Sequence, residues 1–239
     1  MESNRGIRVI PVRGSNERSG HRFDPARLRE VRVEANGEVA PEVRRLSFVR
    51  TWDFVPGQSI ALTIDPAVPP RFYSIASGTG EALVEVLYDV VADGLLTPAL
   101  SALAPGDTLL ASAPFGAFQD ARGPSCWIAT GTGIAPFISM ARSAPLDGKI
   151  LVHGSRTIAG LFDRDFFASR LGDRYVPCCT REPGDGVFSG RPTAWLSYRE
   201  VPRVDRFLLC GNSLMVVDAR DILISGGVPF ENVVAEIYF

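Results

Sequence analysis

The sequence predicts two domains, an N-terminal antiparallel β-barrel followed by a C-terminal α/β domain built on a parallel sheet. Residues 28–118 contain short apolar and β-branched runs separated by Pro, Gly, Asn and Asp, which is typical of an antiparallel barrel or sandwich. From residue 126 onward, compact apolar runs recur with helix-like segments between them. That alternation predicts βαβ units and a parallel sheet.

The first half of the chain supplies the arm and the barrel. Residues 1–22 are polar, basic and without periodicity, so we expect a flexible N-terminal arm before a barrel domain over 23–120. One helical insert is expected, with Asp93 as its N-cap and apolar positions from Leu95 to Leu103. The clearest barrel strands are expected near 28–33, 59–64, 82–90 and 108–112.

The second half, residues 121–239, supplies the α/β domain after a linker at 120–124. Buried strands are expected at 126–130, 149–154, 174–180, 206–212 and 233–239. Helices are expected at 134–143, 163–171, 192–199 and 213–225, the last closed by Gly226 and Gly227.

Composition limits the class of protein. The 239 residues carry 25 basic and 27 acidic side chains, a net charge of −2, which argues against nucleic-acid binding through bulk charge. No apolar run approaches the ~18 residues of a membrane span, and the N-terminal segment lacks the apolar core of a secretory signal. We therefore expect a cytoplasmic enzyme with no nucleic-acid or membrane partner.

The cysteines predict no metal site. They are scattered, without a CxxC or a His/Cys cluster, so neither zinc, an iron–sulfur centre nor a disulfide framework is indicated. The four positions are Cys126, Cys178, Cys179 and Cys210.

A glycine loop follows the first strand of the α/β domain. Gly131, Thr132 and Gly133 lead directly into a helix, where free N–H groups favour an anion and glycines allow a ligand close to the backbone. Pro136 occupies the third glycine position of the dinucleotide fingerprint. From the loop alone, a simple tight turn remains the alternative.

Arginines follow the later strands at the edge where such sheets bind ligands. Arg156 ends the second strand, where NAD-binding folds carry an acid for the ribose 2′-hydroxyl, whereas arginine suits a 2′-phosphate. Thr180 and Arg181 end the next strand, and Arg191 follows a short loop. Their planar forks suit phosphate, so the pattern favours NADPH over NADH. Solvated surface arginines remain the alternative.

The barrel carries one strand with unusual chemistry. Arg71, Phe72, Tyr73 and Ser74 place a basic fork, flat aromatic rings and a hydroxyl together. Such a strand can hold a phosphate, a ring and a ring nitrogen; an ordinary strand is the alternative.

These motifs together resemble the ferredoxin–NADP reductase family over about residues 26–239. The motifs occur in the family's order. They are Phe54-Val-Pro-Gly-Gln58, Arg71-Phe-Tyr-Ser74, Asp93-Gly-Leu-Leu-Thr97, Gly131-Thr-Gly-Ile-Ala-Pro-Phe137, Thr180-Arg-Glu-Pro183 with Gly190-Arg191, and Cys210-Gly-Asn-Ser-Leu-Met215.

The resemblance implies FAD and NADP(H) as cofactors. Arg71 would pair with the flavin pyrophosphate, Tyr73 would pack along the flavin, and Ser74 would lie near flavin N5. Cys210 would lie against the nicotinamide, and Glu236 would complete the catalytic set with Ser74. The implied FAD residues are Arg71, Phe72, Tyr73, Ser74, Leu95, Leu96 and Thr97. The implied NADP residues are Gly131, Thr132, Gly133, Arg156, Thr180, Arg181, Arg191, Gly211, Asn212 and Met215.

The C-terminus implies an aromatic cover for the flavin. Glu236 is followed by Ile237, Tyr238 and Phe239, one residue more than the plant-type pattern. We favour Tyr238 over Phe239 as the stacking ring from its spacing; a plain sheet strand is the alternative.

The activity implied is that of a monomeric ferredoxin or flavodoxin–NADP reductase (EC 1.18.1.2-like). A second reading is an NAD(P)H-dependent reductase component of an oxygenase, or a free-flavin reductase. Such components often carry a fused ferredoxin module, whose cysteine set this chain lacks. A third reading is a non-catalytic flavin-binding electron-transfer subunit, which the intact glycine loop and the arginines argue against.

Overall fold

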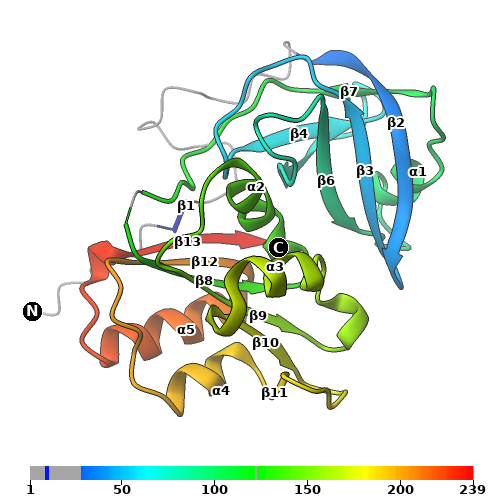
Figure 1. Cartoon of the computed structure of the whole chain (residues 1–239). Helices are drawn as coiled ribbons and strands as arrows, with labels where there is room; N and C mark the ends of the chain where they lie inside the picture. The colour runs from blue at the N-terminus through cyan, green and yellow to red at the C-terminus, as the bar shows by residue number, and fades with distance from the viewer. Residues whose placement is uncertain (1–8, 11–27, 122, 239) are drawn as a thin grey trace, which may run out of the picture.

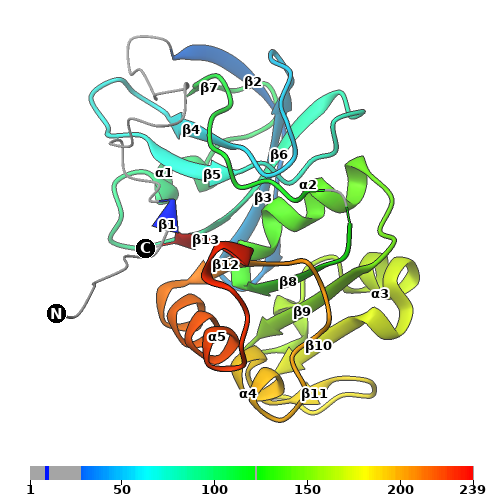
Figure 2. The ribbon, with the colours of Figure 1, turned by 90° about the vertical axis from the view of Figure 1, so that its left-hand side faces the viewer.

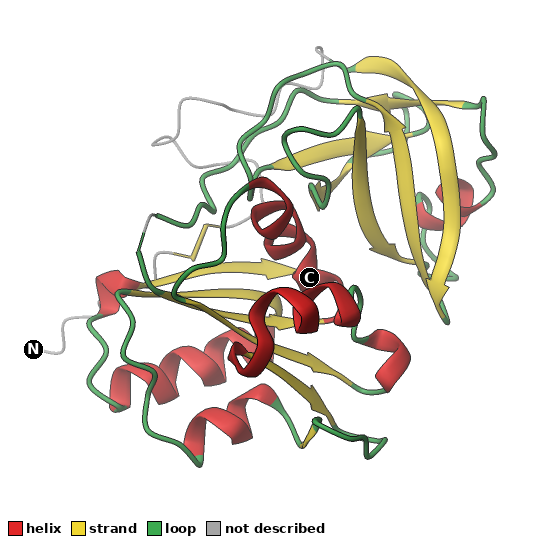
Figure 3. Ribbon diagram, viewed as in Figure 1, coloured by secondary structure: helices red, strands yellow, loops and turns green. Residues whose placement is uncertain are grey.

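The computed structural model describes residues 9–10, 28–121 and 123–238, with the backbone alone for 9, 10 and 238. Within these residues, a six-stranded antiparallel sheet stands beside a seven-stranded parallel sheet (Figures 1 and 3). The predicted fold class is confirmed.

The antiparallel sheet curls into a barrel. Its strand order is β5-β4-β7-β2-β3-β6, and a bridge between Ile75 and Val86 joins the two ends. Alternate residues such as Val31 and Val33 point into an apolar core with Leu46 and Phe48. The strands are β2 (Arg29–Ala40), β3 (Val43–Val49), β4 (Ser59–Thr63), β5 (Arg71–Ser74), β6 (Leu83–Asp89) and β7 (Thr108–Ala111).

The helical insert of the barrel is shorter than predicted. Helix α1 spans Thr97–Ser101 with Leu96 as its N-cap, so Asp93 as N-cap is wrong. Pro98 lies in the first turn, where a missing N–H costs little. Asp93 instead lies in a turn, in which Gly94 N donates to Val91 O at 2.8 Å.

The parallel sheet has the order β1-β13-β12-β8-β9-β10-β11. The chain builds outward from β8 to one side and then returns through β12 and β13 to the other. Two short strands, β1 and β11, were not predicted. The strands are β1 (Val9–Ile10), β8 (Ser125–Thr130), β9 (Lys149–Ser155), β10 (Tyr175–Cys179), β11 (Phe188–Ser189), β12 (Arg206–Asn212) and β13 (Val233–Tyr238).

Helices cover both faces of the parallel sheet. Helices α2 and α3 pack on one face and α4 and α5 on the other (Figures 1 and 2). Strand alternation explains the two layers, since Trp127 stacks on Phe137 of α2 while Ile128 packs with Leu223 of α5. The α-helices are α2 (Ala135–Ser143), α3 (Arg164–Leu171), α4 (Pro192–Ser197) and α5 (Ser213–Ser225). Short 3₁₀ turns lie at Gly131–Ile134, Ile158–Gly160, Gly172–Arg174 and Phe230–Asn232.

Asp120 and Gly123, in the predicted linker, are held by hydrogen bonds. Asp120 Oδ2 accepts hydrogen bonds from Ser125 Oγ, Trp127 Nε1 and Lys149 Nζ, the last at 2.7 Å. Lys149 also donates to the carbonyl of Gly123 at 2.7 Å. The domain boundary between residues 120 and 121 stays a prediction.

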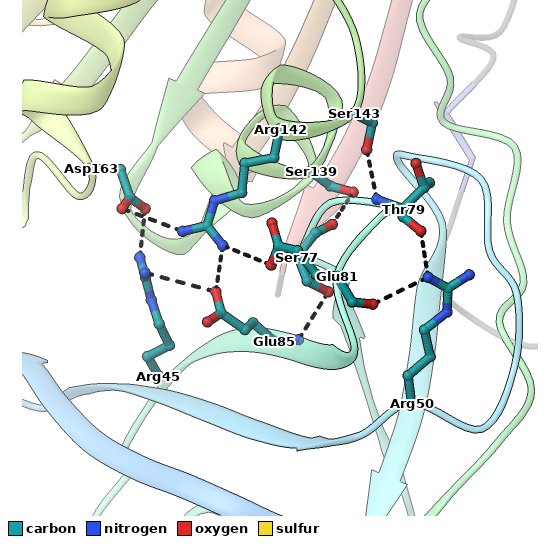
Figure 4. A network of polar contacts seen from close by, with 10 residues as sticks. All are labelled: Arg45, Arg50, Ser77, Thr79, Glu81, Glu85, Ser139, Arg142, Ser143 and Asp163. Atoms are coloured by element: carbon teal, nitrogen blue, oxygen red, sulfur yellow. Dashed lines mark hydrogen bonds and ion pairs between the residues drawn. The ribbon is translucent and has the colours of Figure 1, made fainter.

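A polar network ties helix α2 to the barrel (Figure 4). Arg142 of α2 donates to Glu85 of β6 at 2.7 Å and lies 3.8 Å from Asp163, just before α3. Arg45 of β3 lies 2.5 Å from Asp163 and 3.8 Å from Glu85. These side chains are about one-fifth exposed, so water screens them less than it screens surface pairs.

Hydrogen bonds extend this contact along α2. Ser139 Oγ donates to Ser77 O at 2.7 Å, and Thr79 N donates to Ser143 Oγ at 3.0 Å (Figure 4). A Cβ on Gly78 would lie 2.9 Å from Cβ of Arg142, so glycine permits the close approach. The helix that follows the glycine loop is thereby held against the loop that follows β5.

The N-terminal arm predicted over residues 1–22 lies outside the described residues, except for β1. Val9 and Ile10 pair in parallel with Ala235 and Glu236 of β13. Both are β-branched and apolar, which suits an added strand at a sheet edge. Among the described residues, no helix is both long and apolar enough to cross a membrane.

Candidate functional site

The candidate site lies where the carboxyl ends of β8 and β12 meet below the barrel. These parallel strands are neighbours, but the chain continues from β8 to β9 on one side and from β12 to β13 on the other. Open α/β sheets bind ligands at such a switch point. Strand β13, next to β12, ends below the barrel in both views (Figures 1 and 2).

The three predicted catalytic residues lie together. Ser74 Oγ donates to Glu236 Oε2 at 3.1 Å, and Cys210 Sγ lies 3.9 Å from the same oxygen. Pairing of β12 with β13 places Cys210 directly opposite Glu236. All three side chains are buried. The carboxyl group of Glu236, on β13, thus contacts Ser74 of the barrel and Cys210 of the α/β domain.

Burial controls the charge of this carboxyl group. Desolvation raises the pKa of Glu236 from 4.5 to about 7, although hydrogen bonds from Ser74, Ser59 and Cys210 act to lower it. Near neutral pH the group is therefore able to gain and lose a proton, which is what a general acid or base requires.

Ser59 is a site residue that the sequence analysis missed. Its Oγ lies 3.3 Å from Glu236 Oε1 and 3.2 Å from Ser74 Oγ. Ser59 stands opposite Ser74 in the pairing of β4 with β5. A polar residue inside the apolar strand that follows Gln58 was the available signal.

The Arg71 strand presents its chemistry at the barrel's edge. Arg71 is exposed, whereas Tyr73 is mostly buried and packs edge-on against Tyr88. The Tyr73 hydroxyl is buried and has no hydrogen-bond partner among the described residues. Burial raises the pKa of Tyr73 well above its usual range, so the hydroxyl stays a donor. Phe72 contacts Phe115 edge-on at 5.1 Å.

The segment 95–97 divides its side chains between solvent and core. Leu95 is 80% exposed, while Leu96 is buried in the barrel. The Thr97 hydroxyl accepts a hydrogen bond from Val91 N at 2.9 Å, which orders the turn before α1.

The glycine loop packs tightly on β12. It forms a 3₁₀ turn, Gly131–Ile134, before α2 begins, and Gly131 has a positive φ of 57°. A Cβ on Gly133 would lie 2.5 Å from the carbonyl oxygen of Cys210, and one on Gly211 would lie 2.5 Å from Thr130 Oγ1. Only glycine permits this crossing of the two strand ends.

Asn212 and Met215, two of the implied NADP residues, both have roles in the fold. The side chain of Asn212 caps α5 by accepting from Leu214 N at 3.0 Å. Met215 is buried against the sheet.

Asp89 is a second residue that the sequence analysis missed. Thr132 Oγ1 donates to Asp89 Oδ2 at 3.0 Å, which joins the glycine loop to the end of β6. Burial raises the pKa of Asp89. No sequence signal linked these residues, because they come from different domains.

The predicted phosphate-binding arginines gather at one edge. Arg181 N donates to Arg156 O at 3.0 Å, so the two arginines are backbone neighbours. Gly190, just before Arg191, donates from its N to Cys179 O at 2.8 Å. Arg156, Thr180, Arg181 and Arg191 are all exposed. The structure thus brings four predicted residues to the ends of β9, β10 and β11.

Glu182, which follows Arg181, makes a hydrogen bond of its own. Its Oε2 accepts a hydrogen bond from Ile158 N at 2.6 Å. The acid therefore helps to hold the loop after β9.

Comparisons with known proteins place this geometry in a family. No protein-family model matches the chain. The flavodoxin/ferredoxin–NADP reductase of Rhodobacter capsulatus is 30% identical, over 84% of this chain and 92% of that protein. A probable dihydroorotate dehydrogenase B electron transfer subunit of Pyrococcus abyssi is 29% identical, over 82% of this chain and 74% of that protein.

Solved structures show the same architecture. The Amycolatopsis cytochrome P450 reductase GcoB has a TM-score of 0.78 at 26% identity, over 93% of this chain and 73% of that one. A ferredoxin NADP⁺ reductase from Neisseria gonorrhoeae, solved with bound FAD and NADP, has a TM-score of 0.80 at 22% identity, over 89% of this chain and 99% of that one. The chain belongs to the ferredoxin–NADP reductase family.

Proposed function

We propose that the chain is a flavoprotein reductase that exchanges electrons between NADPH and a one-electron protein carrier such as ferredoxin or flavodoxin. The observation that carries the proposal is the meeting of Ser74, Cys210 and Glu236 at the switch point. Family membership supports it, because the relative from Rhodobacter capsulatus is a flavodoxin/ferredoxin–NADP reductase.

The residues present fit a flavin dinucleotide. The Tyr73 hydroxyl is a buried donor without a partner among the described residues, and the exposed Arg71 precedes it on the same strand. Tyr73 would hold a phosphate or ribityl oxygen with that donor, and the Arg71 guanidinium would pair with the phosphate charge. When bound, FAD supplies the chemistry, by accepting hydride from NADPH and passing electrons on singly.

The chain's own residues orient the reacting groups and hold the proton. The Ser74 hydroxyl holds a hydrogen at the end of β5, and Glu236 Oε2 exchanges a proton with it over 3.1 Å. Cys210 Sγ lies 3.9 Å from the same carboxyl group and would lie next to the nicotinamide in this proposal. Burial of all three excludes water. The stacking role of Tyr238 or Phe239 remains a prediction, because their side chains lie outside the described part.

Anaerobic reduction tests the proposed function. The purified, yellow protein is mixed with NADPH, and the reduced protein is then offered ferredoxins and flavodoxins. Bleaching by NADPH followed by reoxidation by a carrier is the expected result. A yellow protein that NADPH does not bleach rejects the proposal in favour of a non-catalytic electron-transfer subunit.

A reductase component of an oxygenase is the second candidate. The likeness to GcoB, a cytochrome P450 reductase, favours it. The same experiment separates the two candidates, because an oxygenase component reoxidises on an oxygenase or haem partner and not on ferredoxin or flavodoxin.

Loss of Arg71 tests the flavin site. Arg71→Ala removes a charge-assisted contact of roughly 1.5–3 kcal/mol, so the flavin dissociation constant should rise about tenfold or more. The constant is measured by fluorescence titration of the flavin-free protein. Arg32→Ala removes an exposed arginine from β2 and should leave the constant unchanged. An equal constant in Arg71→Ala and wild type refutes the assignment.

Loss of Ser74 tests the chemical step. Ser74→Ala should slow flavin reduction at saturating NADPH about tenfold or more, because the lost hydrogen bond matters most in the transition state. Nucleotide affinity should stay near wild type. Stopped-flow bleaching gives the rate, with Ser47→Ala, another buried barrel serine, as control. A wild-type rate in Ser74→Ala counts against the role.

A further inference from the structure

Ser59, Ser74 and Glu236 form a closed ring of polar groups. Ser59 Oγ lies 3.3 Å from Oε1 of Glu236, Ser74 Oγ lies 3.1 Å from Oε2, and the two serine oxygens lie 3.2 Å apart. The three groups come from β4, β5 and β13, and each is 3% exposed or less. Each group is therefore within hydrogen-bonding distance of the other two.

The ring accommodates both protonation states of the carboxyl group. When Glu236 is ionised, each serine donates its hydrogen to a different carboxylate oxygen. When Glu236 is protonated, three hydrogens serve three contacts in head-to-tail order. Glu236 then donates to one serine, that serine donates to the other, and the second serine donates back. The heavy atoms keep their places when the proton arrives or leaves, and only a serine hydroxyl hydrogen turns.

Three polar side chains act on this carboxyl group through hydrogen bonds. They are Ser59 on β4, Ser74 on β5 and Cys210 on β12. Among these neighbours Cys210 is the titratable one, and burial is the largest cause of the raised pKa of Glu236, ahead of the hydrogen bonds. The proton affinity therefore depends on burial and on these hydrogen bonds, so loss of one serine hydroxyl has a measurable effect.

We propose that Ser59 is a positioning residue of the reductase. Its hydroxyl holds Oε1 of Glu236, which leaves Oε2 facing Ser74 and Cys210, and it helps to set the proton affinity of the carboxyl group. This inference rests on the proposed function, in which Ser74 and Glu236 act beside the flavin. Ser59 itself acts through Glu236 and not on the cofactor.

Infrared titration of the carboxyl group tests the ring without NADPH. The C=O band of protonated Glu236, assigned by its loss in Glu236→Gln, reports the pKa of this group directly. Ser59→Ala should raise that pKa by about one unit, because a donor to the ionised form is lost. Ser59→Thr keeps the hydroxyl and should restore the wild-type value.

Ser112→Ala is the matched control. Ser112 is another buried barrel serine, and its Oγ accepts from Ala61 N of the same strand β4 at 3.0 Å. It bonds β4 without a contact to Glu236, so its loss should leave the carboxyl band unshifted.

The pH profile of flavin reduction by NADPH is the second measurement. Its apparent pKa should move upward with the infrared value in Ser59→Ala and return in Ser59→Thr. An unshifted band in Ser59→Ala overturns the inference, and so does a shifted band with an unmoved pH profile. A wild-type protein that NADPH does not reduce refutes the proposed function instead, because the infrared result does not depend on the nucleotide.

Discussion

NADPH should be used more than about a hundredfold more efficiently than NADH, and single alanine substitutions at Arg181 or Arg191 should each remove about tenfold or more of that preference. Each charged contact to a 2′-phosphate contributes roughly 1.5–3 kcal/mol, so two arginines account for the whole ratio. The structure places Arg181 beside Arg156 and brings Arg191 to the same edge. The measurement is kcat/KM for both nucleotides.

The use of NADH separates a specific contact from general damage. A residue that touches only the 2′-phosphate cannot affect a nucleotide that lacks one, so NADH activity should be spared in both variants. Arg203→Ala, which removes an exposed arginine outside this edge, controls for net charge. Equal use of the two nucleotides by the wild type rejects the claim, and parallel loss of both activities rejects the assigned contacts.

Two acids of the loop after β10, Glu182 and Asp185, lie near the arginines in the sequence, where negative charge opposes phosphate binding. Glu182 has a contact of its own. Its carboxylate instead accepts from Ile158 N at 2.6 Å. The sequence could not reveal this, since the bond joins the loops after two different strands. The contact gives the acid a role that does not require it to face a phosphate.

The fold was predictable because its signals are local. Alternation of side chains along each strand decides which residues reach which layer, as Trp127 and Ile128 show. The start of α1 was mispredicted from an acidic residue that suits an N-cap. Pro98 and the Val91–Thr97 contact decided the helix start instead.

The candidate site was predictable only in part because its contacts are long-range. Motifs identified Ser74, Cys210 and Glu236, but Ser59 meets Glu236 across 177 positions of the chain. The same holds for Thr132 and Asp89, which meet across the domain boundary. Register between β12 and β13 decides that Cys210 lies opposite Glu236, and no local pattern fixes that register.

Acidification from pH 6.5 to 4.5 should destabilise Glu236→Gln by about 2 kcal/mol relative to the wild type, because nothing then offsets the proton that the unfolded chain gains at His153. Burial lowers the pKa of His153 from 6.5 to about 3, so in this window the unfolded chain binds a proton that the folded chain does not. Where this difference amounts to a whole proton, the free energy of unfolding decreases by about 1.4 kcal/mol for each unit by which the pH falls. Glu236 acts oppositely: its pKa is raised from 4.5 to about 7, so the folded chain binds the extra proton and stability rises as pH falls.

Urea unfolding at pH 6.5, 5.5 and 4.5 separates the two groups, since all other acids are common to every variant and cancel in the differences. His153→Gln should gain about 2 kcal/mol of stability relative to the wild type over the same window, because only the stabilising proton uptake at Glu236 remains. The double variant should follow the wild type, in which the two proton uptakes nearly cancel. A pH dependence of Glu236→Gln that matches the wild type contradicts the raised pKa of Glu236. A His153→Gln variant that matches the wild type contradicts the lowered pKa of His153.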